Sequence, residues 1–208
     1  MSGTVAALAL SSAFLSAAAT ILIRQGLRGY GPYTGTLVFE AKGSYVKPDR
    51  GEATLSFGGI TVTKVVIGRQ LWTNFGGVVQ APTQVASPRD GDYSFVAAFW
   101  DTSVTESLKD FSCSSSRDTV NGVRARMCAA NRVTVERLNK EGKLFTTGVL
   151  ELKEFSAGSA ELWVADGDKV IRFRANLAGK DSANRDVALK VDVDITDINA
   201  RITIDPPR

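Results

Sequence analysis

The sequence contains no histidine, and this absence excludes several kinds of active site at once. Histidine is the commonest general base, a usual zinc ligand, and a member of every Ser-His-Asp and Cys-His arrangement. With only two cysteines, the chain also lacks the thiolates for a zinc site built from four of them. We therefore predict no metal, no cofactor and no histidine-dependent hydrolase chemistry.

The sequence also lacks a large excess of charge of either sign. The 25 basic residues only slightly outnumber the 22 acidic ones, and both kinds are spread along the chain. A protein that neutralises nucleic-acid phosphates needs a concentrated basic surface. We therefore expect no nucleic-acid partner.

The other groups that could support catalysis are poorly placed. Ser44 and Lys47 have the spacing of a Ser-x-x-Lys motif, but on a strand their side chains point to opposite faces. No Gly-x-Ser-x-Gly motif is present, and Asp192 and Asp194 fall on a strand face that alternation predicts to be solvated. We predict that the protein is not an enzyme.

The two cysteines, Cys113 and Cys128, lie on either side of an Asn-Gly turn signal. An even count with this spacing favours one disulfide, although two buried free thiols would also account for it. If the disulfide forms, the domain folds outside the reducing cytosol.

The N-terminal segment carries neither charge nor proline from Val5 to Ile23. Its length is close to that of a bilayer-spanning helix, and Ala17-Ala18-Ala19 resembles a signal cleavage site. A core helix would also place three leucines on one face: Leu8, Leu15 and Leu22. A cleaved signal, an anchor through residues 5–23 and a leading helix all stay open. We expect residues 1–31 to precede a single domain of residues 32–208.

The first half of the domain has the pattern of an antiparallel meander. Tyr33 to Val46 is rich in strand-favouring residues, and Leu71 to Thr73 is a further short strand. Between them, Ala53 to Phe57 and Ile60 to Ile67 flank Gly58-Gly59, a pair that suits a tight hairpin turn.

The middle of the chain mixes helix and hairpin signals. Asp92 can cap a helix running through Lys109, with Phe95 and Phe99 at helical spacing. Asn121-Gly122 predicts a hairpin, and Val133 to Asn139 a short helix. The stretch from Lys143 to Glu154 fits neither the helical nor the strand period.

The C-terminal third predicts three antiparallel strands: Ala160 to Val164, Lys169 to Leu177, and Asp186 to Ile195. Apolar and charged residues alternate in the last two, so one face is apolar and the other charged. Arg172 and Arg174 could pair with Asp192 and Asp194 across that charged face. The fold class is α+β, a curved antiparallel sheet with helices packed on its concave face.

Several short strings resemble the LolA-like lipoprotein carrier superfamily, including the mycobacterial LprG/LppX-type lipoproteins. They are Val46-Lys47-Pro48-Asp49-Arg50, Val66-Ile67-Gly68-Arg69-Gln70-Leu71-Trp72, Thr119-Val120-Asn121-Gly122-Val123, Ala160-Glu161-Leu162-Trp163-Val164 and Ile204-Asp205-Pro206-Pro207. The resemblance implies a half-barrel whose helix-covered hollow encloses acyl chains, in proteins that carry lipids or lipoproteins through the cell envelope or sense its state. This sequence departs from the lipoprotein members because it has no cysteine near its N-terminus.

The resulting expectation is a non-enzymatic binding protein of the periplasm or cell envelope that holds a lipid or acylated lipoprotein in an apolar cavity. Burying methylenes needs only an apolar hollow, at about 0.8 kcal/mol each. The expected lining, from alternation and helix facing, is Phe95, Phe99, Ile171, Phe173, Leu189, Val191 and Val193. The alternative is that these side chains fill one another, leaving a packed-core protein-interaction or sensor domain without a lipid ligand.

Overall fold

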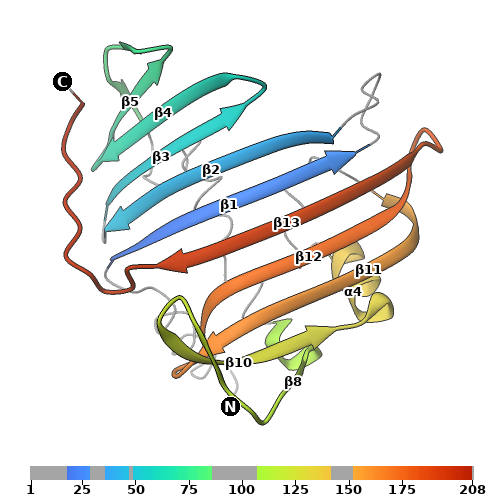
Figure 1. The fold of residues 1–208 in the computed structure, drawn as a ribbon. Helices are drawn as coiled ribbons and strands as arrows, with labels where there is room; N and C mark the ends of the chain where they lie inside the picture. The colour runs from blue at the N-terminus through green and yellow to red at the C-terminus, as the bar shows by residue number, and fades with distance from the viewer. Residues whose placement is uncertain (1–17, 29–35, 47–48, 86–106, 142–151, 208) are drawn as a thin grey trace, which may run out of the picture.

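One large antiparallel sheet dominates the computed structural model, which describes residues 18–28, 36–46, 49–85, 107–141 and 152–207 (Figure 1). Its neighbouring strands follow the order β6-β5-β4-β3-β2-β1-β13-β12-β11-β10-β8, with β7 paired to β5 and β9 paired to β10. The strands are β1 (Ala18–Arg28), β2 (Thr36–Val46), β3 (Arg50–Phe57), β4 (Ile60–Ile67), β5 (Gln70–Phe75), β6 (Val78–Val79), β7 (Thr83–Gln84), β8 (Ser112–Cys113), β9 (Asp118–Val120), β10 (Val123–Ala130), β11 (Leu152–Ala165), β12 (Lys169–Asp181) and β13 (Asp186–Thr196).

This architecture confirms the predicted antiparallel sheet. Among the described strands the sheet stays open, because β6 and β8 at its two ends do not pair with each other. The described helical elements are the α-helix α4 (Arg132–Lys140) and the 3-10 turn η1 (Ser107–Asp110). The predicted packing of several helices on a concave face is therefore not seen in the residues that the structure describes.

The hairpins form where glycine or asparagine allows a left-handed turn. Gly58 and Gly59 join β3 to β4 with φ angles of 55° and 82°. Asn121 and Gly122 join β9 to β10 with φ angles of 52° and 76°. Both pairs have the positive φ angles that a tight hairpin requires, as the sequence predicted.

The N-terminal segment contains the main correction to the sequence prediction. Residues 18–23, expected in a signal, anchor or core helix, belong to strand β1, which lies between β2 and β13. The expected boundary at residues 31 and 32 therefore does not separate an appendage from the sheet. Thr20, Ile21 and Ile23 are β-branched and favour an extended strand over a helix. Residues 1–17 lie outside the described part of the chain.

Helix α4 follows β10 directly and confirms the short helix predicted there. Asn131 caps its N-terminus, accepting a hydrogen bond from the Thr134 backbone N–H at 3.1 Å. Val135 and Leu138 are fully buried on the side of the helix that contacts β11. A Cβ atom on Gly158 of β11 would lie 3.2 Å from Val135 Cγ1, so this glycine permits the close approach of helix and strand.

The predicted helix ending at Lys109 is described only at its end. There, Ser107–Asp110 form η1 rather than an α-helix. Phe95 and Phe99, the two expected cavity residues of that helix, lie outside the described residues.

The segment after β13 crosses back toward the first half of the sheet (Figure 1). Arg50, at the start of β3, donates a hydrogen bond from Nη1 to the Ile204 carbonyl at 3.0 Å. The Ile204 side chain is buried, so this C-terminal segment is held to the sheet by both a polar and an apolar contact.

Candidate functional site: an apolar sheet face

An unbroken row of apolar residues crosses the sheet in register. Each residue of the row is paired directly with the next across neighbouring strands from β5 to β8. Directly opposite residues in antiparallel strands share a face, so these positions form one continuous apolar stripe. The row is Phe75, Val62, Leu55, Ala41, Ile23, Val193, Phe173, Leu162, Cys128 and Cys113. We call it the apolar row.

The row beside it has a different character in the second half of the sheet. There Val191 of β13 is followed in register by three small residues, Ala175, Ala160 and Ala130. All four side chains are buried. The short alanine side chains rise less above the sheet than the Phe173 and Leu162 side chains of the apolar row do.

Four of the expected cavity residues lie together. Phe173, Leu189, Val191 and Val193 belong to one cluster of buried apolar residues, which also includes Val135 and Leu138 of α4. The alternation read from β12 and β13 therefore places these four side chains on the face that α4 approaches. Whether that interior encloses a cavity remains a prediction.

Ile171 is not brought together with them. The register between β11 and β12 shifts after Trp163, because Trp163 pairs with Arg172 whereas Val164 pairs with Val170. Ile171 is thus the extra residue of a β-bulge. It packs in a second cluster with Val120, Ala125 and Ala165, against which Trp163 lies. A simple alternating pattern cannot reveal such a bulge.

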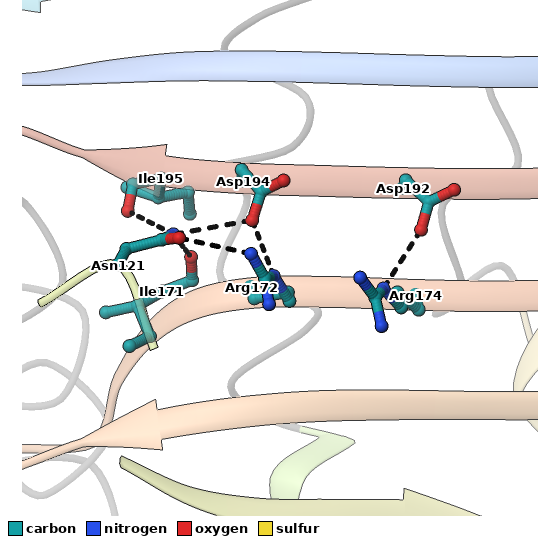
Figure 2. A network of polar contacts seen from close by, with 7 residues as sticks. All are labelled: Asn121, Ile171, Arg172, Arg174, Asp192, Asp194 and Ile195. Carbon is teal, nitrogen blue, oxygen red and sulfur yellow. Dashed lines mark hydrogen bonds and ion pairs between the residues drawn. The ribbon is translucent and has the colours of Figure 1, made fainter. Parts of the chain in front are cut away.

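The opposite face of the same strands carries paired charges (Figure 2). Arg172 Nε lies 2.5 Å from Asp194 Oδ1, and Arg174 Nε lies 3.1 Å from Asp192 Oδ1. Each pair joins residues directly opposite in the β12–β13 ladder. The pairing predicted from the sequence is confirmed, and these carboxylates are engaged in ion pairs.

Trp163 of β11 extends this charged face. Its ring lies beneath both guanidinium groups, with Cζ of Arg172 5.8 Å and Cζ of Arg174 5.3 Å from the ring centroid. Cations at these distances are attracted to the negative face of an aromatic ring. The tryptophan therefore interacts with both arginines on the outer face of the sheet.

The tip of the β9–β10 hairpin docks onto this face through Asn121 (Figure 2). Its Nδ2 donates to the Ile171 and Ile195 carbonyls at 3.3 and 3.4 Å and to Asp194 at 3.3 Å, while its Oδ1 accepts from Arg172 at 3.1 Å. Sequence reasoning identified Asn121 as a turn residue but missed this role, because the contacts reach strands far along the chain.

The predicted disulfide is present. Cys113 of β8 and Cys128 of β10 are bonded to each other and stand directly opposite in the ladder. The bond lies at the end of the apolar row and ties the edge strand β8 to the sheet. A structural disulfide of this kind is typical of proteins that fold in an oxidising compartment.

Within the described residues, no group of acidic and cysteine side chains is arranged to hold a metal ion. No helix in this part of the chain is long and apolar enough to cross a membrane. The site as described consists of apolar surface on one side and ion-paired, hydrogen-bonded polar groups on the other.

No family model and no curated protein matches the sequence. Solved structures similar to the chain include a LolA superfamily protein from Nitrosomonas europaea, at 8% identity and a TM-score of 0.35, covering 96% of this chain and 94% of that one. A DUF1329 family protein from Desulfovibrio piger aligns at 9% identity and a TM-score of 0.29, covering 96% and 92%. An outer membrane lipoprotein-sorting protein domain from Vibrio parahaemolyticus aligns at 7% identity and a TM-score of 0.30, covering 91% and 89%.

The solved structures similar to the chain thus include a protein of the LolA superfamily, the group that the sequence resembles.

Proposed function

We propose that this protein is a non-enzymatic, extracytoplasmic binding protein that holds a lipid or acyl chain against the apolar face of its sheet. The observation that carries the proposal is the apolar row, which runs without a polar interruption from Phe75 to Cys113. A hydrocarbon chain needs contact with such a surface and no catalytic group. Each methylene buried there contributes about 0.8 kcal/mol.

The row of small residues gives the proposed path of the chain. Ala175, Ala160 and Ala130 are neighbours on three consecutive strands, next to Val191. Alanine in place of a larger side chain leaves room above a sheet for a ligand of methylene width. We place the acyl chain over these alanines, between Val191 and the apolar side of α4.

The disulfide supports the extracytoplasmic part of the proposal. Cys113 and Cys128 are joined, and such bonds persist in compartments outside the reducing cytosol. Transport of a lipid or lipoprotein through the cell envelope, or sensing of its state, is the role we propose on this basis.

The burial of the same side chains favours the competing function. Val191 and Val193 are each only 3% exposed, as expected of residues that fill one another in a packed core. In that case the protein is an interaction or sensor domain of the envelope without a lipid ligand. The two functions differ in whether the interior accepts added volume.

Replacing Val191 with Trp separates them. A hollow interior accepts the larger side chain, whereas overpacking a filled core costs about 1–3 kcal/mol or more. The matched control is Val133→Trp, the same substitution on the exposed side of α4. Native mass spectrometry and solvent extraction should find bound lipid in the parent and the control but none in Val191→Trp, with similar melting temperatures. A parent without lipid, together with an unfolded Val191→Trp, would establish the packed core.

A further inference from the structure

Two hairpin turns of the first half of the sheet share one sequence pattern. Phe57-Gly58-Gly59-Ile60 joins β3 to β4, and Phe75-Gly76-Gly77-Val78 joins β5 to β6. All four glycines have positive φ angles, so each turn is a tight two-residue connection. A Cβ atom built on any of the four would meet no atom of the described residues within 4 Å. Both turns are therefore exposed.

The two turns lie side by side at one end of the sheet. Val62, two residues after Ile60, pairs with Phe75, and Phe75 pairs with Val78. Ile60, Phe75 and Val78 consequently share a face with Val62, which belongs to the apolar row. We call these three side chains the apolar tip. The tip continues the apolar face of the sheet out to its end.

Burial distinguishes the tip from the rest of that face. Ile60, Phe75 and Val78 are 52%, 52% and 68% exposed. Val38, at the same end of β2 but on the opposite face, is 57% exposed. Only two other large apolar side chains of the described residues, Val123 and Val133, are comparably open to solvent. Exposed large apolar groups gathered at one place mark a surface that contacts a partner or a membrane.

The charge on the strands that carry the tip favours one kind of partner. Residues 53–85, which span β3 to β7 from Ala53 onward, contain no aspartate or glutamate and two basic residues, Lys64 and Arg69. The rest of the chain carries all 22 acidic residues. Arg69 lies in the turn at the far end of β4, whereas Lys64 shares the face of Val62. Glu40 of β2, in register with Ser56, is on the opposite face. The face that carries the tip thus holds one lysine and no acidic residue on β3 to β6, so it approaches an anionic lipid headgroup layer without repulsion.

We propose that the apolar tip inserts into the surface of a membrane containing anionic lipid. Phe75, Ile60 and Val78 enter the boundary between headgroups and acyl chains, and the two-residue turns place them together at the end of the sheet. This deepens the proposed function and rests on it for its purpose: the tip joins the membrane to the apolar face along which the acyl chain is held.

The size of the tip argues against a second copy of the chain or another protein as the occupant. A stable protein interface uses roughly 20–30 residues on each side. Three side chains on two narrow turns, flanked by the neutral polar residues Ser56, Thr61 and Asn74, are far fewer than that. Shallow insertion into a lipid surface requires only a few apolar side chains.

Flotation of the full-length protein with vesicles tests the proposal. One set of vesicles is phosphatidylcholine alone, and the other is equal parts phosphatidylcholine and phosphatidylglycerol. We expect the parent to partition onto the mixed vesicles more strongly than onto phosphatidylcholine. The double variant Phe75→Ser/Val78→Ser should lose at least tenfold in partitioning, because burial of these two side chains is worth a factor of about ten or more.

The matched control is Val133→Ser, which removes an equally exposed valine from α4, away from the tip. It should bind vesicles as the parent does. Val78→Trp, which adds a residue favoured at the membrane interface, should raise the bound fraction. All variants should keep the parent melting temperature, since the altered side chains are more than half exposed.

The proposal is overturned if the parent fails to bind either kind of vesicle, if the serine double variant binds as the parent does, or if Val133→Ser loses as much binding as that variant. It is also overturned if sedimentation shows a parent dimer that the double variant abolishes while vesicle binding is unchanged. Lipid content by native mass spectrometry is measured separately. If the parent protein carries lipid but does not bind vesicles, the proposed membrane insertion of the apolar tip is refuted and the proposed function is not. If it binds vesicles but carries no lipid, the proposed function is refuted.

Discussion

The two faces of the β12–β13 ladder are built from alternate residues of the same strands, yet they are held together by different forces. Phe173, Val191 and Val193 point to one side and are almost completely buried. Arg174 and Asp192 point to the other, where they form an ion pair that solvent reaches. The backbone hydrogen bonds are common to both faces. Any difference in what the two faces contribute to the free energy of unfolding therefore comes from the side chains alone.

Substitutions on the two faces should therefore change the free energy of unfolding by different amounts. On the apolar face, removed volume leaves a cavity that neighbouring side chains cannot fill. On the charged face, each ion pair gains little because water screens it. The hairpin tip at Asn121 is an intermediate case, since it covers part of the charged face and buries polar atoms there.

The largest effect is expected from interrupting β1, which continues both faces. Ile23 of β1 stands in the apolar row, and the next position, Arg24, is in register with Asp192 on the charged side. Proline at Ile23 removes a backbone donor from a central strand, where proline is not tolerated. Ile23→Pro should therefore yield no cooperative thermal transition.

Val79→Pro is its control on the edge strand β6. Gln80 donates its backbone N–H to the Thr73 carbonyl, so in the alternating ladder the Val79 N–H points away from β5. This variant should melt cooperatively. If Ile23→Pro melts like Val79→Pro, β1 is not part of the stable sheet, and the N-terminal segment is a separate appendage after all.

Truncation on the apolar face should have the next largest effect. Phe173 is fully buried between Leu162 and Val193 in the apolar row. Phe173→Ala should lower the free energy of unfolding by about 3–5 kcal/mol, measured by urea denaturation. Val133→Ala, on the exposed side of α4, should change it by less than about 0.5 kcal/mol. Equal losses for the two variants would contradict the assignment of the faces.

Removal of the Asn121 side chain should cost less. Asn121→Gly keeps the positive φ of the turn but deletes four hydrogen bonds to β12 and β13. We expect a loss of about 1–2 kcal/mol in the free energy of unfolding. Asn184→Gly, at another left-handed turn position, is the control and should be close to neutral. A neutral Asn121→Gly would show that the hairpin tip docks without its asparagine.

The contribution of one charged group, Asp181, to stability can be tested by varying the pH. Hydrogen bonds from the Arg185 side chain, and then from its backbone N–H, hold the pKa of Asp181 below its ordinary value. A lowered folded-state pKa adds stability above the unfolded pKa of about 3.9, and this stability is lost as the pH falls through the folded value. Asp181→Asn should thus be less stable than the parent at neutral pH and converge with it in acid, as measured by urea denaturation across pH. If the free energies of unfolding of the variant and the parent differ by the same amount at every pH, the Asp181 carboxylate does not contribute stability in this way.

The smallest effect is expected at the Arg174–Asp192 pair. A double-mutant cycle with Arg174→Gln and Asp192→Asn should give a coupling energy below about 1 kcal/mol. The coupling should weaken further when salt is added. A larger, salt-independent coupling would mean that the outer face contributes to stability as the apolar face does, and the contrast between the faces would fail.

Those parts of the sheet that local patterns determine were predictable from the sequence. Alternating apolar and charged residues identified β12 and β13, and the pairs Gly58-Gly59 and Asn121-Gly122 identified two hairpin turns. These signals depend on neighbouring residues only. The cross-strand ion pairs followed from the same alternation, since residues in register share a face.

The remainder depends on contacts that no local pattern contains. The segment before Arg24 is predicted from its long uncharged stretch as a signal, an anchor or a core helix, although its β-branched residues favour a strand. Ile171 was assigned to the wrong group of neighbours because a bulge moved it. The apolar row could not be seen at all until the register of the first half was known.

The position of β1 has a consequence for how the protein folds during synthesis. Strands β2 to β6 and β10 to β13 are each joined mainly by hairpins between consecutive strands, so each half-sheet can form from short-range contacts. Of the described strands, however, β1 comes first in the sequence and pairs with β13, which comes last. Contacts between segments far apart in the sequence raise the contact order and slow folding. Until β13 has emerged, the strand edges on either side of this seam stay unpaired, and the unfinished chain is exposed to aggregation unless a chaperone holds it.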